Sequence, residues 1–492
     1  MATTHVVRPH PYRVRPTGSR LLTESPNLRD VSLGWLRLLS DELLLRVFSH
    51  LEARSLARLA CASKALRVVA CTEELWKALV LEQLPPSERL RYTAGTWRNT
   101  FLSRLGHAGS ICPPPSSSDG LFYYSDVLYA PWHCGTASIP PNWHRGRETI
   151  ERVHASCLSV EDFTKRFEAP GYPVILTGAM DGWPALHLWT ESQLRERFGN
   201  GAEFHVGGHA MGLADFYDYC ATNTDEQPLY LFDKKALVDE MAQEFTVPDY
   251  FAPSRDLFEA LPQAYRPDHR WLIVGGTRSG SSWHIDPNAT SAWNACVYGR
   301  KKWILCPPKK PPPGVDASED GTNVTSPISL FEWFRVFYGS LAQMRKEAPP
   351  GATVALEATL GPGEILFVPS GWWHCCLNVE PSLAVTQNYA PRSWARPIWK
   401  YLQGGESKGD LVSGIAPELR PQMAGVFEDV LRRHCPEALQ TTDEEEKDAA
   451  AAPHVVEELS KSLKQARKGL AAAVVAPDAA NGDGVADFRF SF

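Results

Sequence analysis

Apolar residues near the start of the chain recur at the spacing of an α-helix. They follow one another every three or four residues, which places them on one face of a helix. These residues are Leu39, Leu43, Leu44, Val47, Phe48 and Leu51. Ser40 can cap the first turn, and Asp41 and Glu42 place negative charge at the positive end of the helix dipole. The pattern predicts an amphipathic helix that begins after Ser40.

Two further helices are predicted in the same region. Ser55 is expected to open the second one, whose apolar or small positions are Leu56, Leu59, Ala60, Ser63 and Leu66. The third is expected to begin within residues 73–76. Short connections between the helices favour a small helical bundle.

Downstream of about residue 149, helical spacing gives way to short apolar runs of strand length. Such runs, separated by glycine and proline, predict a β-barrel or jelly roll. The expected strands cover residues 173–176, 229–232, 271–274, 292–298, 302–305, 365–368, 373–379 and 383–389. A helix over residues 192–198 is expected to end at Gly199, and the proline-rich stretch 307–313 is expected to form a surface loop. The chain as a whole is predicted to be an α+β protein.

The predicted regions follow one another along the chain. They are a basic disordered segment at 1–30, a helical domain at 31–84, a connecting segment at 85–148, a β-rich domain at 149–392 and a helical C-terminal region at 393–492. The stretch CPPPSSS at 112–118 predicts a poorly ordered linker. In the last region, helices are expected at 423–434 and 454–470, on either side of an acidic, alanine-rich disordered spacer.

Composition narrows the class of protein. The 492 residues carry a formal net charge of -7 and include 11 cysteines, none of them in a C-x-x-C pair. An odd number of scattered cysteines argues against a disulfide framework and favours a reducing compartment. No apolar run reaches the roughly 18 residues of a membrane span, and the start lacks an apolar signal core. We therefore expect no membrane association and no secretion.

The first 22 residues are basic. They carry Arg8, Arg13, Arg15 and Arg20 and no acidic residue. Such a segment suits a nuclear address, an organelle transit peptide or an RNA-binding arm, but a disordered basic tail is the simpler interpretation. Because the whole chain is acidic, it has no general attraction to nucleic acid, and direct nucleic-acid binding stays open.

His284 and Asp286 are candidate metal ligands. On a strand, residues two positions apart project from the same face, so both side chains can reach one ion. Imidazole and carboxylate suit a divalent metal, and a third ligand would complete a facial triad. Taken alone, the motif has a surface pair as its alternative, because 15 histidines give about one such triplet by chance.

A later segment supplies the third candidate ligand. The run GEILFVPSGWWH at 363–374 predicts a strand, a tight turn and a second strand that places His374 in an apolar stretch. A lone buried histidine is usually a core residue, but here the earlier pair gives it a chemical partner. We therefore expect His284, Asp286 and His374 to bind one metal ion.

The helical region resembles an F-box. The resemblance rests on LSDELLLRVFSHLEARSLARLACASKALR followed by ELWK. In that family the helices dock onto the Skp-type adaptor of a cullin-RING ubiquitin ligase, and the resemblance implies the same partner here. A helical bundle that only packs on the next domain is the alternative.

The β-rich domain resembles the Jumonji C (JmjC) family, in its branch of phosphatidylserine-receptor-like arginine demethylases and lysyl hydroxylases. The matching stretches are GGTRSGSSWHIDPNATSAWNACVYGRKKWILCPP and GPGEILFVPSGWWHCCLNVEPSLAVTQNYA. The resemblance implies a double-stranded β-helix, a cupin-like jelly roll with flanking helices. It also implies that His284, Asp286 and His374 hold Fe(II), with 2-oxoglutarate and O2 as co-substrates.

Five more residues match family positions that bind 2-oxoglutarate or line its pocket. They are Lys301, Thr386, Asn294, Tyr230 and Ser281. Ser281 keeps a hydroxyl where related sequences often have threonine. On the strand that follows the turn, His374, Cys376 and Asn378 share a face, so Cys376 is expected near the metal. A zinc site at residues 374–376 is disfavoured because adjacent cysteines point to opposite sides of a strand.

Lys301 is expected to meet the distal carboxylate of 2-oxoglutarate. Residues 292–298 and 301–305 predict two hairpin strands, with Lys301 and Trp303 on one face. A lysine among apolar neighbours is unfavourable unless it meets an anion. Register alone leaves Lys302 as the alternative, and the family motif selects Lys301.

The resemblance implies a reaction that couples oxidative decarboxylation of 2-oxoglutarate to hydroxylation of a protein side chain. Hydroxylation of an N-methyl carbon releases formaldehyde and therefore demethylates, whereas attack on a chain carbon leaves a hydroxylated residue such as hydroxylysine. We expect methylated arginine or lysine of a histone or RNA-associated protein as the substrate. The expected location is the nucleus, with the cytoplasm as the alternative.

Two other functions are compatible with the sequence. The barrel could act without turnover, as the target-binding part of an F-box substrate receptor. The complete set of metal ligands, with Lys301 and Thr386, argues against this function, because a pure binder needs no iron. Alternatively, a cupin-like barrel could hold manganese or zinc, since affinity series alone do not select iron.

Overall fold

The computed structural model describes residues 8–440 except 24, 94, 107–119, 238, 240, 309, 319–320, 322, 406 and 408. The predicted linker at 112–118, the acidic spacer and the predicted helix at 454–470 lie outside the described residues. The chain divides into two compact units, one from Met1–Asp256 and Asp268–Trp394, the other from Leu257–Pro267 and Ala395–Phe492. Among the described helices, none has the length and apolar character that crossing a membrane requires.

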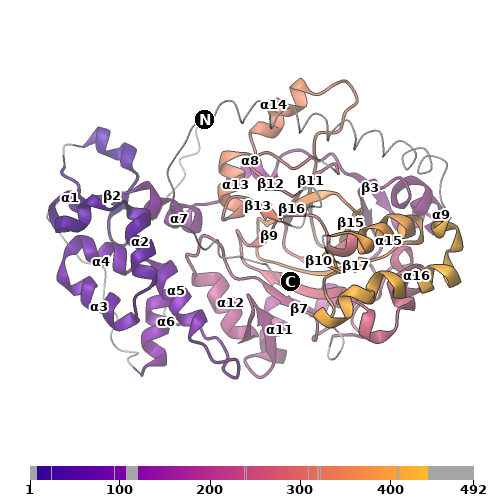
Figure 1. Ribbon diagram of the computed structural model, residues 1–492, viewed down its shortest axis with the longest axis horizontal. Coiled ribbons are helices and arrows are strands. Elements are labelled where there is room, and N and C mark those ends of the chain that lie inside the picture. The colour runs from indigo at the N-terminus through magenta and orange to yellow at the C-terminus, as the bar shows by residue number, and fades with distance from the viewer. Residues whose placement is uncertain are drawn as a thin grey trace, which may run out of the picture. The chain divides into compact units, whose positions relative to one another are not determined.

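The first unit begins with a helical region, drawn in indigo in Figure 1. Its helices are α1 Leu28–Ser32, α2 Asp41–Ser49, α3 Ala53–Ala62, α4 Lys64–Ala70, α5 Glu73–Glu82 and α6 Trp97–Arg104. We call residues 28–104 the N-terminal helical region. Helix α2 confirms the first predicted helix, because the Ser40 hydroxyl accepts the Leu43 N–H at its start, and Leu44 and Phe48 are buried.

The second predicted helix is wrong in one respect, because two helices occupy its place. Ser63, expected inside the helix, has an extended backbone (φ -156°, ψ 162°) between α3 and α4. Its hydroxyl accepts the Leu66 N–H at 3.2 Å and so caps α4. A serine side chain competes for backbone N–H groups, and helical spacing of apolar positions does not reveal that competition. Helix α3 also begins before Ser55, whereas α5 begins where the third helix was predicted.

The described part of the basic N-terminal segment is ordered, contrary to the prediction. Strand β1 (Val14–Arg15) pairs in parallel with β2 (Tyr123–Tyr124), and Val14 is buried. The guanidinium groups of Arg13 and Arg15 lie over the Phe122 ring, at 4.3 and 3.4 Å from its centroid. A guanidinium group that stacks on an aromatic ring is held in place by that contact. The positive charge of the segment, from which disorder was predicted, does not indicate this contact. The connecting region also contains helices, α7 Asp126–Thr136 and α8 Pro141–His144.

Two sheets form the β-rich part of the first unit. The larger has the strand order β3-β4-β15-β10-β17-β8-β7-β5-β6, and the smaller has the order β14-β11-β16-β9. The larger sheet comprises β3 Glu151–His154, β4 Val174–Thr177, β5 Glu203–Val206, β6 His209–Gly212, β7 Leu231–Asp233, β8 Arg270–Gly275, β10 Ser291–Tyr298, β15 Glu364–Val368 and β17 Ser382–Tyr389. The smaller comprises β9 Gly280–His284, β11 Lys301–Cys306, β14 Leu356–Leu360 and β16 Trp373–Asn378. Each predicted strand is present, and a short hairpin, β12 Asp316–Ala317 and β13 Val324–Thr325, lies apart from both sheets.

A single buried cluster joins the inner faces of the two sheets. From the larger sheet it takes Ile175, Ala292, Cys296, Leu366 and Val368, and from the smaller Trp303, Leu305, Leu356, Ala358, Leu360 and Cys376. Burying apolar side chains between two sheets is what closes a jelly roll. The predicted α+β fold with a cupin-like double-stranded β-helix is confirmed.

The other face of the larger sheet packs on helices and aromatic side chains. Trp293 and Val385 belong to a core that also contains Phe163, at the end of α9 (Val160–Phe163), and Trp183, just before α10 (Ala185–Leu188). The helix predicted at 192–198 is α11 Glu191–Phe198, and Gly199 ends it with a positive φ of 49°. Helix α12 (Leu213–Thr222) leads from β6 towards β7.

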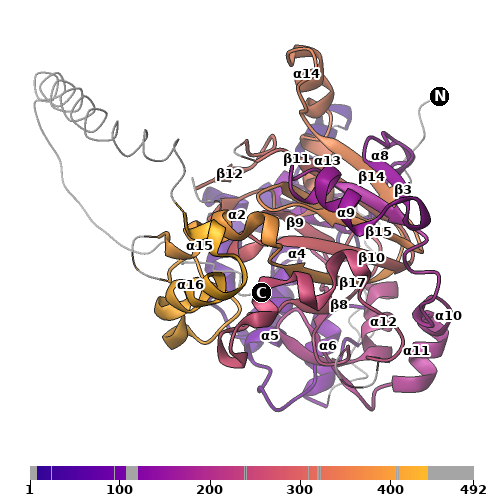
Figure 2. The ribbon, with the colours of Figure 1, turned by 90° about the vertical axis from the view of Figure 1, so that its right-hand side faces the viewer.

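The second unit is helical. Its helices α15 (Ala395–Gln403) and α16 (Met423–His434) lie side by side (Figure 2). Helix α16 coincides with the helix predicted at 423–434. The Phe427 ring packs edge-on against Phe258 at 5.5 Å, so the short segment Leu257–Pro267 belongs to this unit's core.

A buried charge cluster lies beside the smaller sheet. Lys302 Nζ is 3.0 Å from Glu357 Oε2, and both side chains are fully buried. Arg345, from α14 (Ser340–Glu347), and the Tyr338 hydroxyl also contact the Glu357 carboxylate. Burial raises the pKa of Glu357, but Lys302 and these other partners outweigh burial and hold the pKa below its ordinary value. Glu357 is therefore the carboxylate that balances the buried Lys302 and the partly buried Arg345.

Glu357→Gln is expected to lower the free energy of unfolding by about 3 kcal/mol or more, because it leaves Lys302 and Arg345 without their anion. Urea denaturation at pH 7 measures the change. The control is Asp268→Asn, which removes an exposed ion pair with Lys234 and should cost less than about 1 kcal/mol. Equal losses for the two variants would contradict this account of the cluster.

Candidate active site

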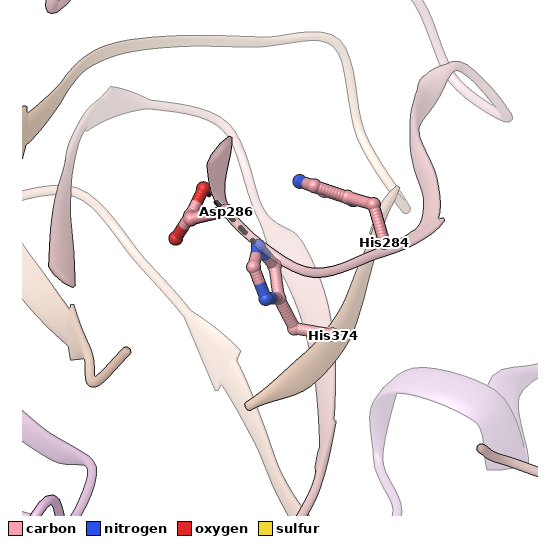
Figure 3. Close-up of side chains that lie close together, drawn as sticks. All are labelled: His284, Asp286 and His374. Carbon is pink, nitrogen blue, oxygen red and sulfur yellow. Dashed lines mark ion pairs between the residues drawn. The ribbon is translucent and has the colours of Figure 1, made fainter. Parts of the chain in front are cut away.

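His284, Asp286 and His374 come together at one end of the smaller sheet. His284 ends β9, Asp286 follows it, and His374 lies near the start of β16. The two histidines are direct cross-strand partners, with ring centroids 4.2 Å apart. Figure 3 shows the three side chains pointing towards one another. One candidate ligand atom from each residue lies within 4.8 Å of the other two, and Asp286 Oδ1 is 3.9 Å from His374 Nε2.

A β-bulge in β9 brings side chains of this site to the same face of the strand. His374 is opposite His284, but Cys376 is opposite Ser281, so β9 carries one extra residue between the two pairs. Directly opposed residues face the same side, and the extra residue therefore puts both Ser281 and His284 on the inner face. Gly280, which precedes the bulge, has a φ of 145°, and a Cβ there would lie 1.9 Å from the Cys376 carbonyl oxygen. The expected strand position of Asp286 is wrong, since β9 already ends at His284.

Both histidines are held in the form that binds a metal through Nε2. His284 Nδ1 is 2.7 Å from the Ser282 carbonyl oxygen, and His374 Nδ1 is 2.9 Å from that of Trp372. A carbonyl oxygen only accepts, so each Nδ1 carries the proton and donates it, and Nε2 is the unprotonated nitrogen of each ring. Burial, assisted by the neighbouring His374, lowers the pKa of His284 to about 4. The His284 ring is therefore neutral at physiological pH.

Asp286 completes a donor set for a divalent cation. Its Oδ2 atom is buried and has no hydrogen-bond partner among the described residues. A buried carboxylate oxygen without a donor is unfavourable unless a cation balances it. Two imidazole nitrogens and one carboxylate match a facial triad with open positions, which is typical of non-haem iron. The residues therefore fit iron.

Lys301 is a buried cation with uncharged partners. Its side chain is 1% exposed, and Nζ donates to the Tyr230 hydroxyl at 3.0 Å and to Asn378 Oδ1 at 2.7 Å. Burial lowers the pKa of Lys301, but the neighbouring Cys376 and Tyr230 outweigh burial and hold it above its ordinary value. No described carboxylate lies within ion-pair distance of it. Lys302 points to the opposite face of β11. Of the two adjacent lysines, Lys301 is therefore the one that faces the inside of the barrel.

The remaining expected site residues lie on the inner faces of the sheets. Asn294 and Thr386 are cross-strand partners in β10 and β17, and Asn294 Oδ1 is buried with no partner among the described residues. The Thr386 hydroxyl donates to the Trp293 carbonyl oxygen at 3.1 Å. Cys376 lies beside Lys301 and is not one of the three clustered metal ligands. Burial raises the pKa of its thiol to about 11, against the opposing effect of Lys301, so the thiol is neutral.

Two residues absent from the expected set support the site. Asn378 accepts from Lys301, and the period of two along β16 had already placed it on the inner face. The Ser370 hydroxyl donates to the Ala289 carbonyl oxygen at 2.7 Å, and the Ser370 N–H donates to the Ser291 hydroxyl at 3.1 Å. Ser370 thereby joins the turn before His374 to the loop after Asp286. Nothing in the local sequence indicates these two long-range contacts.

Comparison with known families matches both parts of the first unit. A cupin-like domain matches residues 160–394, and an F-box-like segment matches residues 41–82. The first match contains the three clustered ligands and Lys301. The second contains helices α2 to α5.

Three relatives identify the family. The arginine-specific demethylase JMJ22 of Arabidopsis thaliana is 38% identical over 97% of this chain and 88% of its own length. The lysine-specific demethylase JMJ21 of the same plant is 37% identical over 73% of this chain, which corresponds to 37% of that protein. The bifunctional arginine demethylase and lysyl-hydroxylase psr-1 of Caenorhabditis elegans is 36% identical over 53% of this chain and 66% of its own length.

The chain therefore belongs to the JmjC family of cupin-like oxygenases, in the branch of arginine demethylases and lysyl hydroxylases, and it carries an F-box-like region. More distant relatives bear the name 2-oxoglutarate and iron-dependent oxygenase. The His-Asp-His cluster of this chain agrees with that cofactor requirement.

The full-length protein is expected to bind one Co(II) ion, used as a probe, per chain. His374→Ala should weaken this binding by more than about 100-fold, because it removes a direct ligand. Calorimetric titration under anaerobic conditions measures the affinity. His205→Ala, at an exposed histidine of β5, serves as the control and should leave the affinity unchanged. Undiminished Co(II) binding by His374→Ala would refute the assignment of the site.

Proposed function

We propose that this protein is an Fe(II)- and 2-oxoglutarate-dependent oxygenase that demethylates methylated arginine in a protein substrate. The observation that carries the proposal is the convergence of two imidazoles and a carboxylate, with one ligand atom of each within 4.8 Å of the others, in the same barrel as the buried cation Lys301. The second oxygen of that carboxylate, Asp286 Oδ2, is buried without a hydrogen-bond partner among the described residues. The similarity to an arginine-specific demethylase over 97% of the chain favours arginine. The names of the other relatives keep lysine demethylation and lysyl hydroxylation as alternatives.

In this proposal, His284, Asp286 and His374 hold the iron, and three protein ligands leave positions open for the reactants. When bound, iron with 2-oxoglutarate and O2 supplies the oxidation that yields succinate and carbon dioxide and hydroxylates a C–H bond. Lys301 binds the distal carboxylate of the co-substrate, which supplies the anion that its neutral partners Tyr230 and Asn378 do not provide. Tyr230 orients the Lys301 ammonium group through its hydroxyl.

Asn294, Thr386 and Ser281 line the co-substrate site from three strands of the two sheets. Asn294 Oδ1 is buried and has no hydrogen-bond partner among the described residues, which suits a side chain that contacts a bound co-substrate. The apolar cluster between the sheets excludes water from the same space, which strengthens each charged contact within it. A histone or RNA-associated protein is the substrate we propose, and the nucleus is the proposed location.

The test incubates the full-length protein with Fe(II), 2-oxoglutarate and peptides that carry methylarginine, methyllysine or unmodified lysine. Mass spectrometry should show loss of one CH2 group from the methylarginine peptide, with succinate formed in equal amount. His284→Ala should form neither product. A gain of one oxygen atom on lysine would replace demethylation by hydroxylation, and the absence of succinate with every peptide and with the protein alone would defeat the oxygenase proposal.

We propose a second function, docking onto a Skp-type adaptor, because the N-terminal helical region exposes a group of apolar side chains. Trp35 and Leu38, in the short helix Gly34–Leu38, are 85% and 73% exposed. Leu43 and Val47, on α2, are 53% and 50% exposed. Several large apolar side chains exposed within one short stretch of the chain are typical of protein-binding surfaces. The match to an F-box-like segment over residues 41–82 supports an adaptor as the partner.

Leu43→Glu combined with Val47→Glu is expected to weaken binding to a purified Skp-type adaptor by more than about tenfold, since each places a charge in an apolar interface. Biolayer interferometry measures the affinity, and succinate formation should stay at the wild-type rate. Leu188→Glu, at an exposed leucine of α10, is the matched control and should bind normally. Wild-type adaptor binding by the double variant, or no binding by the wild-type protein, would contradict this second function.

A further inference from the structure

Asp225 is a buried carboxylate between the N-terminal helical region and the barrel. It is 6% exposed and receives three hydrogen bonds. Lys77 Nζ, from α5, is 2.8 Å from Oδ2, and the Trp97 indole N–H, from α6, donates to Oδ1 at 2.7 Å. The Tyr219 hydroxyl, from α12, donates to Oδ2 at 2.6 Å. Two of these three donors therefore come from the N-terminal helical region.

One connection runs from Asp225 to the co-substrate lysine through Tyr219. Because the Tyr219 hydroxyl donates its proton to Asp225, its oxygen accepts the Leu229 N–H, at 2.8 Å. Leu229 is next to Tyr230, whose hydroxyl accepts from Lys301. The carboxylate thus sets the orientation of a hydroxyl that anchors the backbone beside Tyr230.

A second connection reaches the other partner of Lys301. The Arg278 guanidinium donates to the Cys134 carbonyl oxygen at 3.0 Å and to that of Asp225 at 3.5 Å. The Arg278 backbone N–H donates to the Asn378 carbonyl oxygen at 2.9 Å, and Asn378 Oδ1 accepts from Lys301. Arg278 has a positive φ of 75°, a strained conformation for a non-glycine residue that surrounding contacts must hold in place. Both partners of Lys301 are therefore linked to the Asp225 segment.

We infer that Asp225 is a positioning residue for 2-oxoglutarate and that the N-terminal helical region helps to hold it. This inference rests on the proposed function, because it assigns Lys301 to the distal carboxylate. Asp225 acts through Tyr219 and Tyr230 on one side and through Arg278 and Asn378 on the other. The F-box-like region is in this view a support of the oxygenase site as well as a docking surface. Loss of the Asp225 contacts frees the partners of Lys301 and weakens co-substrate binding, while the metal ligands keep their places.

The experiment measures 2-oxoglutarate binding to the Co(II)-loaded full-length protein by calorimetry, together with KM and kcat for succinate formation. Asp225→Asn keeps the size of the side chain but puts an amide N–H2 group opposite one of the donors. Tyr219→Phe removes only the hydroxyl that joins Asp225 to Leu229. We expect both to raise Kd and KM for 2-oxoglutarate by about three- to tenfold, with kcat and Co(II) affinity within about twofold of wild type.

Three further variants make the result decisive. Lys77→Met removes one of the three donors to Asp225 and should give a smaller rise in the same direction. Arg89→Met removes a different ion pair between the helical region and the barrel, Arg89 to Glu203 at 2.6 Å, and should leave Kd unchanged. Lys301→Met sets the maximum loss of co-substrate binding.

Each outcome has one meaning. A rise in Kd for Asp225→Asn and Tyr219→Phe, without one for Arg89→Met, supports the inference. Equal effects of Arg89→Met and Tyr219→Phe would overturn it in favour of general loosening, and wild-type Kd in Tyr219→Phe and Lys77→Met would overturn it even if Asp225→Asn fails to fold. If the wild-type protein itself binds no 2-oxoglutarate, the proposed function fails and not only this inference.

Discussion

The pairing of β9 with β16 is the constraint on which the site depends. These two strands place His284 directly opposite His374, and the bulge in β9 then puts Ser281 on the same inner face. Because these strands pair, two histidines far apart in the chain become neighbours through the backbone alone. No long, flexible side chain is needed to bring them together. Gly280 makes this pairing possible, because the Cys376 carbonyl oxygen occupies the space that a Cβ would need. The backbone pairing of β9 with β16 therefore fixes where the two histidines lie.

Two adjacent buried lysines on β11 have different kinds of partner. Lys301 and Lys302 point to opposite faces of β11, and both are buried. Lys302 meets a resident carboxylate, Glu357, and so belongs to the fixed structure. Among the residues that the structure describes, Lys301 meets a phenol and an amide, and the co-substrate supplies its anion in the function we propose. A buried cation left with neutral partners is a feature of a binding site, because stability alone would favour an apolar residue there.

The N-terminal helical region and the barrel share one apolar core within the first unit. Trp97 and Tyr219 belong to that core, and the Asp225 carboxylate binds both of their polar groups. A buried polar group is stable only when all its hydrogen-bond partners are in place. The position of the loop between α12 and β7 therefore depends on helices of the N-terminal helical region and of the barrel. An F-box-like region attached in this way differs from one tethered by a linker. Its contacts reach residues that surround Lys301.

The sequence by itself determined eight strands of the two sheets, the helices α2, α5, α11 and α16, and the three candidate metal ligands, since these depend on local periodicity and on short motifs. It did not reveal the helix break at Ser63, because the spacing of apolar positions does not show that a serine hydroxyl competes for backbone N–H groups. It did not reveal the order at Val14, because the strand that pairs with it lies far along the chain. Tertiary structure alone decided that Ser370 joins the two ligand segments and that Asp225 joins the helical region to the barrel. Those contacts link residues far apart in the chain. Periodicity reports which face of a strand is buried, whereas only the folded chain shows what that face meets.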